Sequence, residues 1–170
     1  MSGSSTAAAS PEVVVRRMRW WDVAPVVALD AELFGDTAWS PALFWSELAG
    51  VPQTRDYLVA TTGDGTDAEQ IVAYGGLMTV ARESTVQTLG VAPAWQRAGL
   101  GRRVLRALVS AARRRSATDL WLEVARENLG AQALYRAEGL TAVSTRSSYY
   151  GVGRDAVIMR GRLSRGPLAP

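Results

Sequence analysis

Alternating hydrophobic and polar positions mark the first group of elements, the strands. A β-branched run from Val13 to Met18 predicts a strand near the start of the chain. Later runs are separated by polar or glycine-containing turns, as expected of strands that follow one another along the chain. They comprise residues 57–61, 70–80, 85–91, 120–124, 141–150 and 154–160.

Apolar residues at helical spacing mark the second group, which comprises residues 22–34, 40–50, 99–115 and 128–138. Asp22 and Ser40 are suitable N-caps for the first two helices, and Pro41 suits a first helical position. The order of strands and helices predicts a mixed α/β fold, in which one sheet carries helices on both faces.

The organisation expected from these elements is one domain, at residues 13–162. Residues 1–12, mostly Ser and Ala, are expected to form a disordered tail without the features of a signal peptide. Residues 163–170 are expected to form a loose tail. No run approaches the 18 or more apolar residues that a transmembrane helix needs, so no membrane association is expected.

Composition narrows the chemistry, because the 170 residues contain no Cys, no His and no Lys. This excludes covalent catalysis by Cys, Ser activated by His, Schiff bases on Lys and the zinc sites built from Cys or His. Catalysis must therefore use carboxylates, hydroxyls, Arg and backbone amides. The lack of Cys also rules out disulfides and favours a cytoplasmic location.

Charge is distributed unevenly between the two halves of the chain. The net charge is +3 overall, but residues 1–85 carry 5 Arg and 11 acids whereas residues 86–170 carry 14 Arg and 5 acids. The second half is therefore expected to attract polyanions, either nucleic acid or a phosphorylated cofactor.

A glycine-containing turn lies between the strand that ends at Val91 and the helix that follows. Gly99 and Gly101 allow a ligand to approach the backbone closely, and the amides of a first helical turn have no partners within the helix. Arg97 and Arg102 flank the glycines and are placed to contact a diphosphate. The alternative is a turn whose glycines only ease the entry into a surface helix. The spacing matches neither a Walker loop nor GxGxxG.

The turn from Gln96 to Gly101 resembles the Gln/Arg-x-x-Gly-x-Gly/Ala signature of the Gcn5-related N-acetyltransferases. The resemblance spans residues 13–162 and, more narrowly, concerns the RimI branch, which acetylates the N-terminal alanine of a small-subunit ribosomal protein. It rests on the turn and on residues 120–124, 128, 133–135, 138–140, 149–150 and 156–159. It implies a mostly antiparallel sheet of six to seven strands with about four helices.

The resemblance also implies acetyl-coenzyme A as co-substrate and no metal. Its pyrophosphate is expected on the turn, and the main chain of the preceding strand, splayed from its neighbour, is expected to contact the rest of the coenzyme. The implied coenzyme-binding residues are Leu89, Gly90, Val91, Arg97, Ala98, Gly99, Leu100, Gly101, Arg102 and Asn128. Gly90 departs from the bulkier residue common in the family, which would widen the slot or mark a bulge. Asn128 suits an N-cap, a coenzyme contact, or both.

Two side chains are candidates for proton transfer. Glu123 interrupts the apolar strand at residues 120–124 and suits a general base, although a strand acid that merely faces solvent has the same pattern. Tyr135 is, by the resemblance, the general acid that reaches the coenzyme sulfur; the alternative is an aromatic ring packed on the sheet. Because there is no Cys to carry an acetyl group, direct transfer in a ternary complex is expected.

The acceptor is expected to be the N-terminal peptide of a ribosomal protein. Residues 22–56 carry six acids and one Arg, which suits a cationic peptide but is also compatible with solvated helix faces. Trp39, Tyr149 and Tyr150 are expected to line the peptide slot, or else to pack in the core.

Two alternatives remain open at this point. One is a related acetyltransferase for Lys side chains or small amines. The other is a silent basic module for RNA or ribosomes that would use clusters such as residues 113–115. We expect no direct nucleic-acid ligand, and a monomer or weak dimer.

Overall fold

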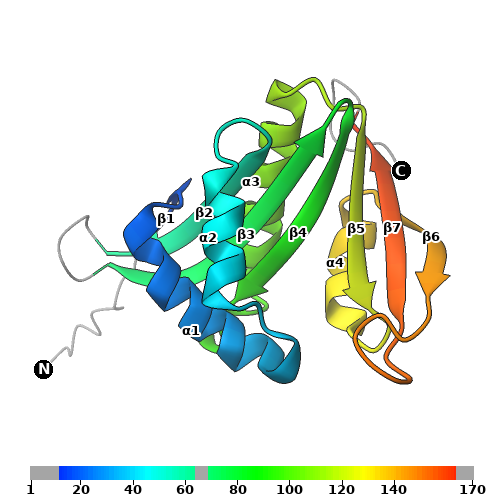
Figure 1. The fold of residues 1–170 in the computed structure, drawn as a ribbon, viewed down its shortest axis with the longest axis horizontal. Coiled ribbons are helices and arrows are strands. Elements are labelled where there is room, and N and C mark those ends of the chain that lie inside the picture. Colours follow the sequence, from blue (N-terminus) through cyan, green and yellow to red (C-terminus); the bar gives the residue numbers. More distant parts are fainter. Residues whose placement is uncertain (1–11, 64–68, 164–170) are drawn as a thin grey trace, which may run out of the picture.

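The structure, a computed structural model, describes residues 12–63 and 69–163. Within them, seven strands form a single sheet in the order β1-β2-β3-β4-β5-β7-β6 (Figure 1). The strands are β1 Val13–Arg17, β2 Arg55–Thr62, β3 Gln70–Val80, β4 Glu83–Val91, β5 Asp119–Ala125, β6 Thr141–Arg146 and β7 Ala156–Arg162. Neighbouring strands are antiparallel except for the parallel pair β4–β5. The predicted mixed α/β, mostly antiparallel fold is confirmed.

Helices cover both faces of this sheet (Figure 1). The four α-helices are α1 Val23–Phe34, α2 Pro41–Ala49, α3 Leu100–Arg114 and α4 Leu129–Ala137; short 3-10 turns lie at Trp20–Asp22, Gly35–Thr37 and Pro93–Trp95. α1 and α2 pack on one face, while α3 and α4 lie on the other. None of the helices in the described part of the chain is long and apolar enough to span a bilayer.

The core forms two clusters, one on each face of the sheet. The cluster under α3 includes Leu105, Leu108 and Leu120, all fully buried. The cluster under α1 and α2 includes Phe44 and Tyr74, which are also fully buried. The apolar spacing along α3 and along the strands predicts this arrangement, because each apolar face must be buried against another element.

Element ends agree with the sequence in some places and differ in others. Ser40 caps α2 as predicted, since its Oγ accepts the amide of Leu43 at 3.2 Å. Asp22 takes the N-cap position of α1, but its carboxylate makes no capping bond there. It turns back instead, accepting the amide of Arg19 at 2.7 Å and the guanidinium of Arg16 at 2.7 and 2.9 Å. The prediction of an Asp22 cap is therefore wrong, because the half-buried guanidinium of Arg16 competes for the same oxygens.

The last two strands are shorter or shifted relative to the prediction. β6 ends at Arg146 rather than at Tyr150, and β7 spans Ala156–Arg162. Residues 147–153 form turns, in which Gly151 and Gly153 have φ values of +120° and +75°. Leu163, expected at the start of a loose tail, is buried in the core below α3. Residues 164–170, 1–11 and the predicted turn at 64–68 lie outside the described residues.

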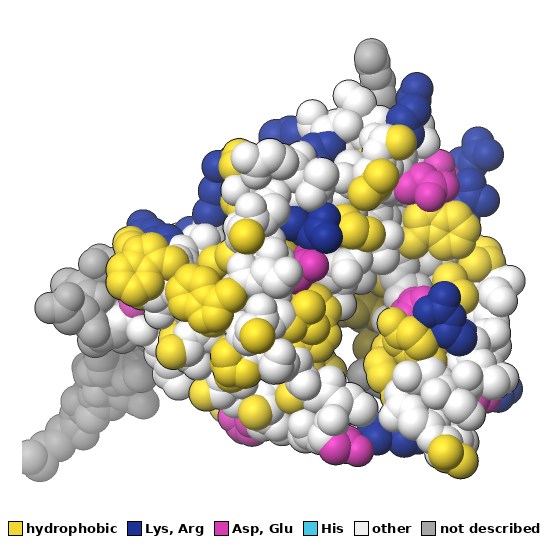
Figure 2. All heavy atoms as spheres, viewed as in Figure 1, with side chains coloured by type: hydrophobic (Ala, Val, Ile, Leu, Met, Phe, Trp, Pro, Cys, Tyr) yellow, Lys and Arg dark blue, Asp and Glu magenta, His cyan; other side chains and the backbone are white. Residues whose placement is uncertain are grey.

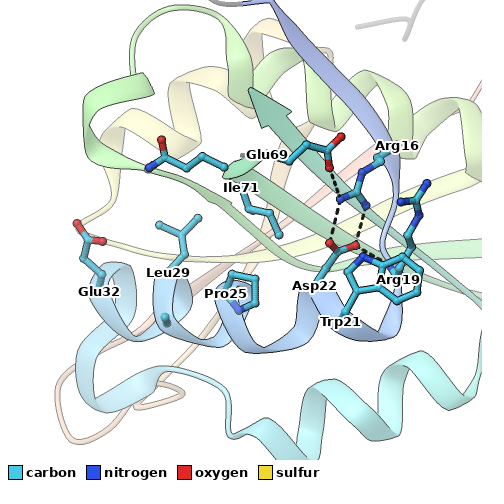
Figure 3. Close-up of a pocket in the computed structure, with 12 residues that line it drawn as sticks. Arg16, Arg19, Trp21, Asp22, Pro25, Leu29, Glu32, Glu69 and Ile71 are labelled. Atoms are coloured by element: carbon cyan, nitrogen blue, oxygen red, sulfur yellow. Dashed lines mark hydrogen bonds and ion pairs between the residues drawn. The ribbon is translucent and has the colours of Figure 1, made fainter. Parts of the chain in front are cut away.

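A side cavity of about 780 Å³ lies where β1, α1 and the start of β3 meet (Figure 3). Arg16 projects between Asp22 and Glu69 and bonds to both, at 2.7 and 2.9 Å. The Arg19 guanidinium lies over the ring of Trp21, 5.3 Å from its centroid. This ion-pair network joins the first strand to the first helix.

Candidate active site

Strands β4 and β5 separate in the middle of the sheet. Their parallel pairing runs from Glu83 opposite Asp119 to Val86 opposite Leu122 and goes no further among the described residues. The β3–β4 register also shifts here, because Gly76 pairs with Thr88 and Leu77 pairs with Val86. Residue 87 is therefore a β-bulge, which bends β4 away from β5. The expected splaying of this strand is confirmed.

A cleft of about 970 Å³ extends along the separated strands (Figure 2). The view shows the surface hollowed between the part built on β1 to β4 and the part built on β5 to β7. The predicted residues that line the cleft are Trp39, Leu89, Gly90, Val91, Arg97, Gly99, Gly101, Arg102, Glu123, Asn128, Tyr135 and Tyr150. Ala98, Leu100 and Tyr149 are not among its lining residues, and the side chain of Leu100 is buried in the core.

The turn before α3 has the backbone geometry of an anion cradle. Gly99 takes φ +82°, and Arg97 takes φ +63°, which is uncommon for a residue with a side chain. A Cβ on Gly101 would lie 3.3 Å from a methyl group of Leu134, so a side chain there would crowd the cleft wall. The first amides of α3 point out of the helix with the positive end of its dipole. The turn therefore offers unpartnered donors to an anion.

The two arginines of the turn are in different situations. Arg102 is paired with the buried Glu138 at 2.9 Å, and Arg106 shares the same carboxylate at 2.8 Å. Arg97 lines the cleft, is exposed and has no ion pair among the described residues. Arg97 is thus the arginine that is available to a phosphate, while Arg102 also fastens α3 to the end of α4.

Gly90 neither widens the slot nor forms the bulge. It lies opposite Tyr74, and a Cβ at this position would lie 2.5 Å from the Tyr74 ring. The ring of Tyr74 is fully buried and occupies the space that a side chain at residue 90 would fill. Both sequence interpretations of Gly90 are therefore wrong, because the bulge lies three residues earlier and the space belongs to Tyr74.

Glu123 faces the cleft one residue beyond the last β4–β5 pair. Its side chain is 24% exposed, and its Oε1 lies 2.9 Å from Nη1 of Arg146 on β6. The phenol of Tyr149 hydrogen-bonds to the same carboxylate, which raises the pKa of Tyr149. Glu123 is thus oriented by two side chains from the end of the chain. The alternative that it simply faces solvent does not hold.

Tyr135 lies on α4, lines the cleft and is 7% exposed. Burial, and secondarily the nearby Tyr150, raise the pKa of Tyr135 to about 12. The phenol therefore stays protonated at neutral pH and can donate a hydrogen bond into the cleft. The same ring packs in the core, as the alternative interpretation expected, and its place in the cleft lining leaves the catalytic role a prediction.

Aromatic side chains line the other end of the cleft. Trp39 packs on Phe44 with ring centroids 5.3 Å apart, and Tyr150 stacks edge-on with Tyr149 at 4.9 Å. Arg154 of the β6–β7 connection lies 3.1 Å from Asp36, which follows α1, so that the two halves of the molecule meet at the cleft.

The acids at residues 22–56 do not form the expected acidic rim. Four of the six are ion-paired within the protein, namely Asp22, Asp36, Glu47 and Asp56. Asp30 is buried, and Glu32 lines the side cavity rather than the cleft. The cleft acid whose side chain has neither an ion pair nor a hydrogen bond in the described part of the chain is Glu127, on the opposite half. The sequence analysis did not predict Glu127 as a site residue, because Glu127 lies outside the motifs that indicated the other site residues.

The arginine cluster at residues 113–115 is partly structural. Arg115 binds the carboxylate of Asp56 and the backbone carbonyls of Pro52, Gln53 and Arg55. This ties the end of α3 to the segment before β2, which weakens the interpretation of the cluster as an RNA-binding surface.

Comparison with known proteins identifies the family. The family model described as "Acetyltransferase (GNAT) family" matches residues 18–140, well over half of the chain. The chain belongs to the GNAT family. It is therefore an acetyltransferase, and members of this family take acetyl-CoA as acetyl donor. No group of three or more potential metal-ligating side chains occurs among the described residues.

Individual GNAT proteins resemble this chain over most of its length. The N-alpha-acetyltransferase RimI of Mycobacterium tuberculosis is 41% identical over 138 residues, covering 78% of this chain and 81% of that protein. The crystal structure of the ribosomal-protein-S18-alanine N-acetyltransferase from Escherichia coli superposes with a TM-score of 0.77 at 26% identity, covering 91% and 96% of the two chains. A Salmonella typhimurium structure solved with acetyl-CoA shares the fold, with a TM-score of 0.70, 20% identity and coverage of 91% and 97%.

Proposed function

We propose that this GNAT protein transfers the acetyl group of acetyl-CoA to the free N-terminal α-amine of a protein, with an N-terminal alanine of a ribosomal protein as the acceptor. The observation that carries the proposal is the gap between β4 and β5, which has Glu123 and Tyr135 on its lining. The names of the Mycobacterium tuberculosis and Escherichia coli relatives support the choice of an α-amine.

The residues of the cleft suit the acetyl donor. The amides at the start of α3 and the uncommitted Arg97 would hold the diphosphate, where positive charge and free donors coincide. Main-chain groups of residues 87–91, which lack a β5 partner, would bond to the extended arm of the coenzyme. Asn128 already caps α4 by accepting the amide of Ala131 at 3.0 Å, so its side-chain amide nitrogen is the group left for the ligand.

The transfer is a direct displacement at the thioester. The amine nitrogen attacks the acetyl carbonyl carbon, a C–N bond forms, the C–S bond breaks, and the amine loses one proton while the thiolate leaves. Glu123 accepts the amine proton, either directly or through a water molecule. An α-amine has a pKa of about 7.7 to 8.0, against about 10.4 for a Lys side chain, so a carboxylate base suits the α-amine better.

Tyr135 stabilises the leaving sulfur. Burial raises its pKa to about 12, above the ordinary value of about 8.5 for a thiol, so full proton transfer from the phenol to the thiolate is unfavourable. The phenol therefore donates a hydrogen bond to the sulfur, and the thiolate takes its proton from solvent after it leaves. We therefore propose that Tyr135 acts as a hydrogen-bond donor to the sulfur rather than as the general acid that the sequence suggested.

The charge of the acceptor follows from Glu127 rather than from the N-terminal half. Glu123 and Glu127 both raise the pKa of Tyr150 through their charge, after the larger effects of burial and of Tyr149, and all three of Glu123, Glu127 and Tyr150 line the cleft. With Glu123 occupied by the reacting amine, Glu127 would attract a cationic side chain of the same peptide. A positively charged residue next to the acetylated N-terminus is therefore favoured.

A peptide panel tests the proposed function. The protein is incubated with acetyl-CoA and with Ala-starting peptides, N-terminally blocked Lys peptides and polyamines, and products are located by mass spectrometry. We expect acetylation of free N-terminal amines and sequential kinetics. Acetylation confined to Lys side chains or polyamines would contradict the proposal, and a ping-pong pattern would contradict direct transfer.

A further inference from the structure

Asp30 on α1 is a buried carboxylate that the proposed chemistry does not use. It is 1% exposed, yet it belongs to the lining of the cleft. The other buried acids, Asp22 and Glu138, are each held by arginine, whereas no cation pairs with Asp30 among the described residues. A buried carboxylate without a cation is costly for folding. A role other than stability therefore explains its presence better.

Two hydrogen-bond donors satisfy this carboxylate from opposite directions. Oδ2 accepts the backbone amide of Trp39 at 2.6 Å, and Oδ1 accepts the phenol of Tyr74. Trp39 belongs to the segment between α1 and α2, and Tyr74 belongs to β3. The segment's own turn bond, from the amide of Ala38 to the carbonyl of Gly35, lies within the segment, and the Trp39 ring packs on Phe44 of α2. Asp30 adds a hydrogen bond that holds the backbone of Trp39 to α1.

The link continues to the strand that would bear the acyl donor. Tyr74 fills the space over Gly90 of β4. Thr88, Gly90 and Trp39 all line the cleft. Asp30 itself lies on α1, which packs directly on β3 and β4, so its bond to Trp39 places the aromatic wall of the acceptor side relative to β4 without depending on Tyr74.

We propose that Asp30 is a positioning residue for the acceptor: its carboxylate holds Trp39 at a defined place opposite β4 and so shapes the slot for the N-terminal peptide. The inference rests on the proposed function. The Trp39 N–H can only donate, so it needs an acceptor at residue 30, whereas the Tyr74 phenol can either donate or accept. A side chain without a polar group at residue 30 therefore removes the contact with Trp39. Coenzyme binding, which uses the start of α3 and the other end of the cleft, does not depend on this contact.

Two variants separate positioning from mere stability. Asp30→Ala removes the acceptor of the Trp39 amide, while Tyr74→Phe removes the other donor and leaves the contact of Trp39 with Asp30 intact. Both variants are expected to lower the melting temperature. Asp30→Ala is expected to raise the acceptor KM about tenfold with the acetyl-CoA KM changed by less than about twofold, whereas Tyr74→Phe changes the acceptor KM by less than about twofold.

Steady-state kinetics with an Ala-starting peptide, alongside calorimetry with acetyl-CoA, measure these effects. An unchanged acceptor KM in Asp30→Ala, or equal increases in both variants, would overturn the inference. If Asp30→Ala does not fold, Asp30→Glu replaces it, because the longer side chain displaces the carboxylate and must also raise the acceptor KM. A wild-type protein that acetylates no α-amine refutes the proposed function instead, so the two failures are distinguishable.

Discussion

Individual residues of the cleft have separate tasks because their surroundings differ. Glu123 is partly exposed and contacts Arg146 and Tyr149, so it is held in place but remains accessible from the cleft. Tyr135 is buried, which keeps its phenol protonated. One group is thus suited to accept a proton and the other to donate a hydrogen bond.

Replacing Glu123 with Gln is expected to lower kcat by roughly 10²- to 10⁴-fold, because the amide cannot accept the amine proton. Steady-state assays with an Ala-starting peptide measure the change. Acetyl-CoA affinity, measured by calorimetry, serves as the control and should stay the same. Turnover close to that of the wild type would mean that Glu123 is not the base.

Replacing Tyr135 with Phe is expected to lower kcat by about 10- to 100-fold, a smaller loss than that of full proton transfer, because one hydrogen bond to the sulfur is removed. Since the pKa of Tyr135 is about 12, its ionisation does not contribute to the pH profile of the wild type below about pH 10. A wild-type activity that falls between pH 8 and 10 and no longer does so in Tyr135→Phe would contradict this assignment.

At the scale of the elements, the decisive feature is the way β4 leaves β5. The bulge at residue 87 and the end of pairing at Val86 create the gap that the cleft occupies. Tyr74 of β3 then fills the space over Gly90, so the floor of the gap is closed from the side of α1. The shape of the cleft thus depends on packing between neighbouring strands.

Gly90→Ala is expected to reduce the free energy of unfolding by about 1–3 kcal/mol, since its Cβ would overlap the immobile Tyr74 ring. Gly99→Ala is the matched comparison: nothing lies within 4 Å of the added Cβ, so only the positive φ opposes it, at a cost of about 1 kcal/mol. Urea denaturation gives both values. A Gly90→Ala protein as stable as the wild type would show that Tyr74 can move.

On the scale of the whole molecule, long-range ion pairs join segments that are far apart in the sequence. Arg115 joins α3 to the segment before β2, and Arg154 joins the β6–β7 connection to Asp36. Arg16 joins β1 to α1 through Asp22 (Figure 3). Burial acts to raise the pKa of Asp22, but the bonds from Arg16 and the amide of Arg19 outweigh it and leave this pKa below its ordinary value.

The lowered pKa of Asp22 predicts a contribution to acid stability. A carboxyl group with a lower pKa in the folded protein stabilises it fully above the unfolded value of about 3.8. That stabilisation is lost as the pH falls through 3.8 towards the folded value. Asp22→Asn should therefore lower the free energy of unfolding by about 1–3 kcal/mol at pH 7 and by less near pH 3. Equal losses at both pH values in urea titrations would contradict the assignment.

The sequence by itself determined the elements and the chemistry available to them. The period of α3, the Ser40 cap and the Gly99 turn are local, because hydrogen bonds and dihedral angles within a few residues decide them. The lack of Cys, His and Lys limited the proton-transfer groups to carboxylates and phenols. The linked motifs then indicated the family, which the comparison confirmed.

Only the tertiary structure decided which charges remain available. The sequence predicted Arg102 as a coenzyme contact and counted Asp36 among the acids of residues 22–56, but partners 36 and 118 residues away engage them, while Arg97 and Glu127 stay uncommitted. The buried link from Asp30 to Trp39 and Tyr74 likewise joins residues on three elements. Ion pairing and burial depend on distances between residues that are far apart in the sequence, so no local sequence pattern predicts them.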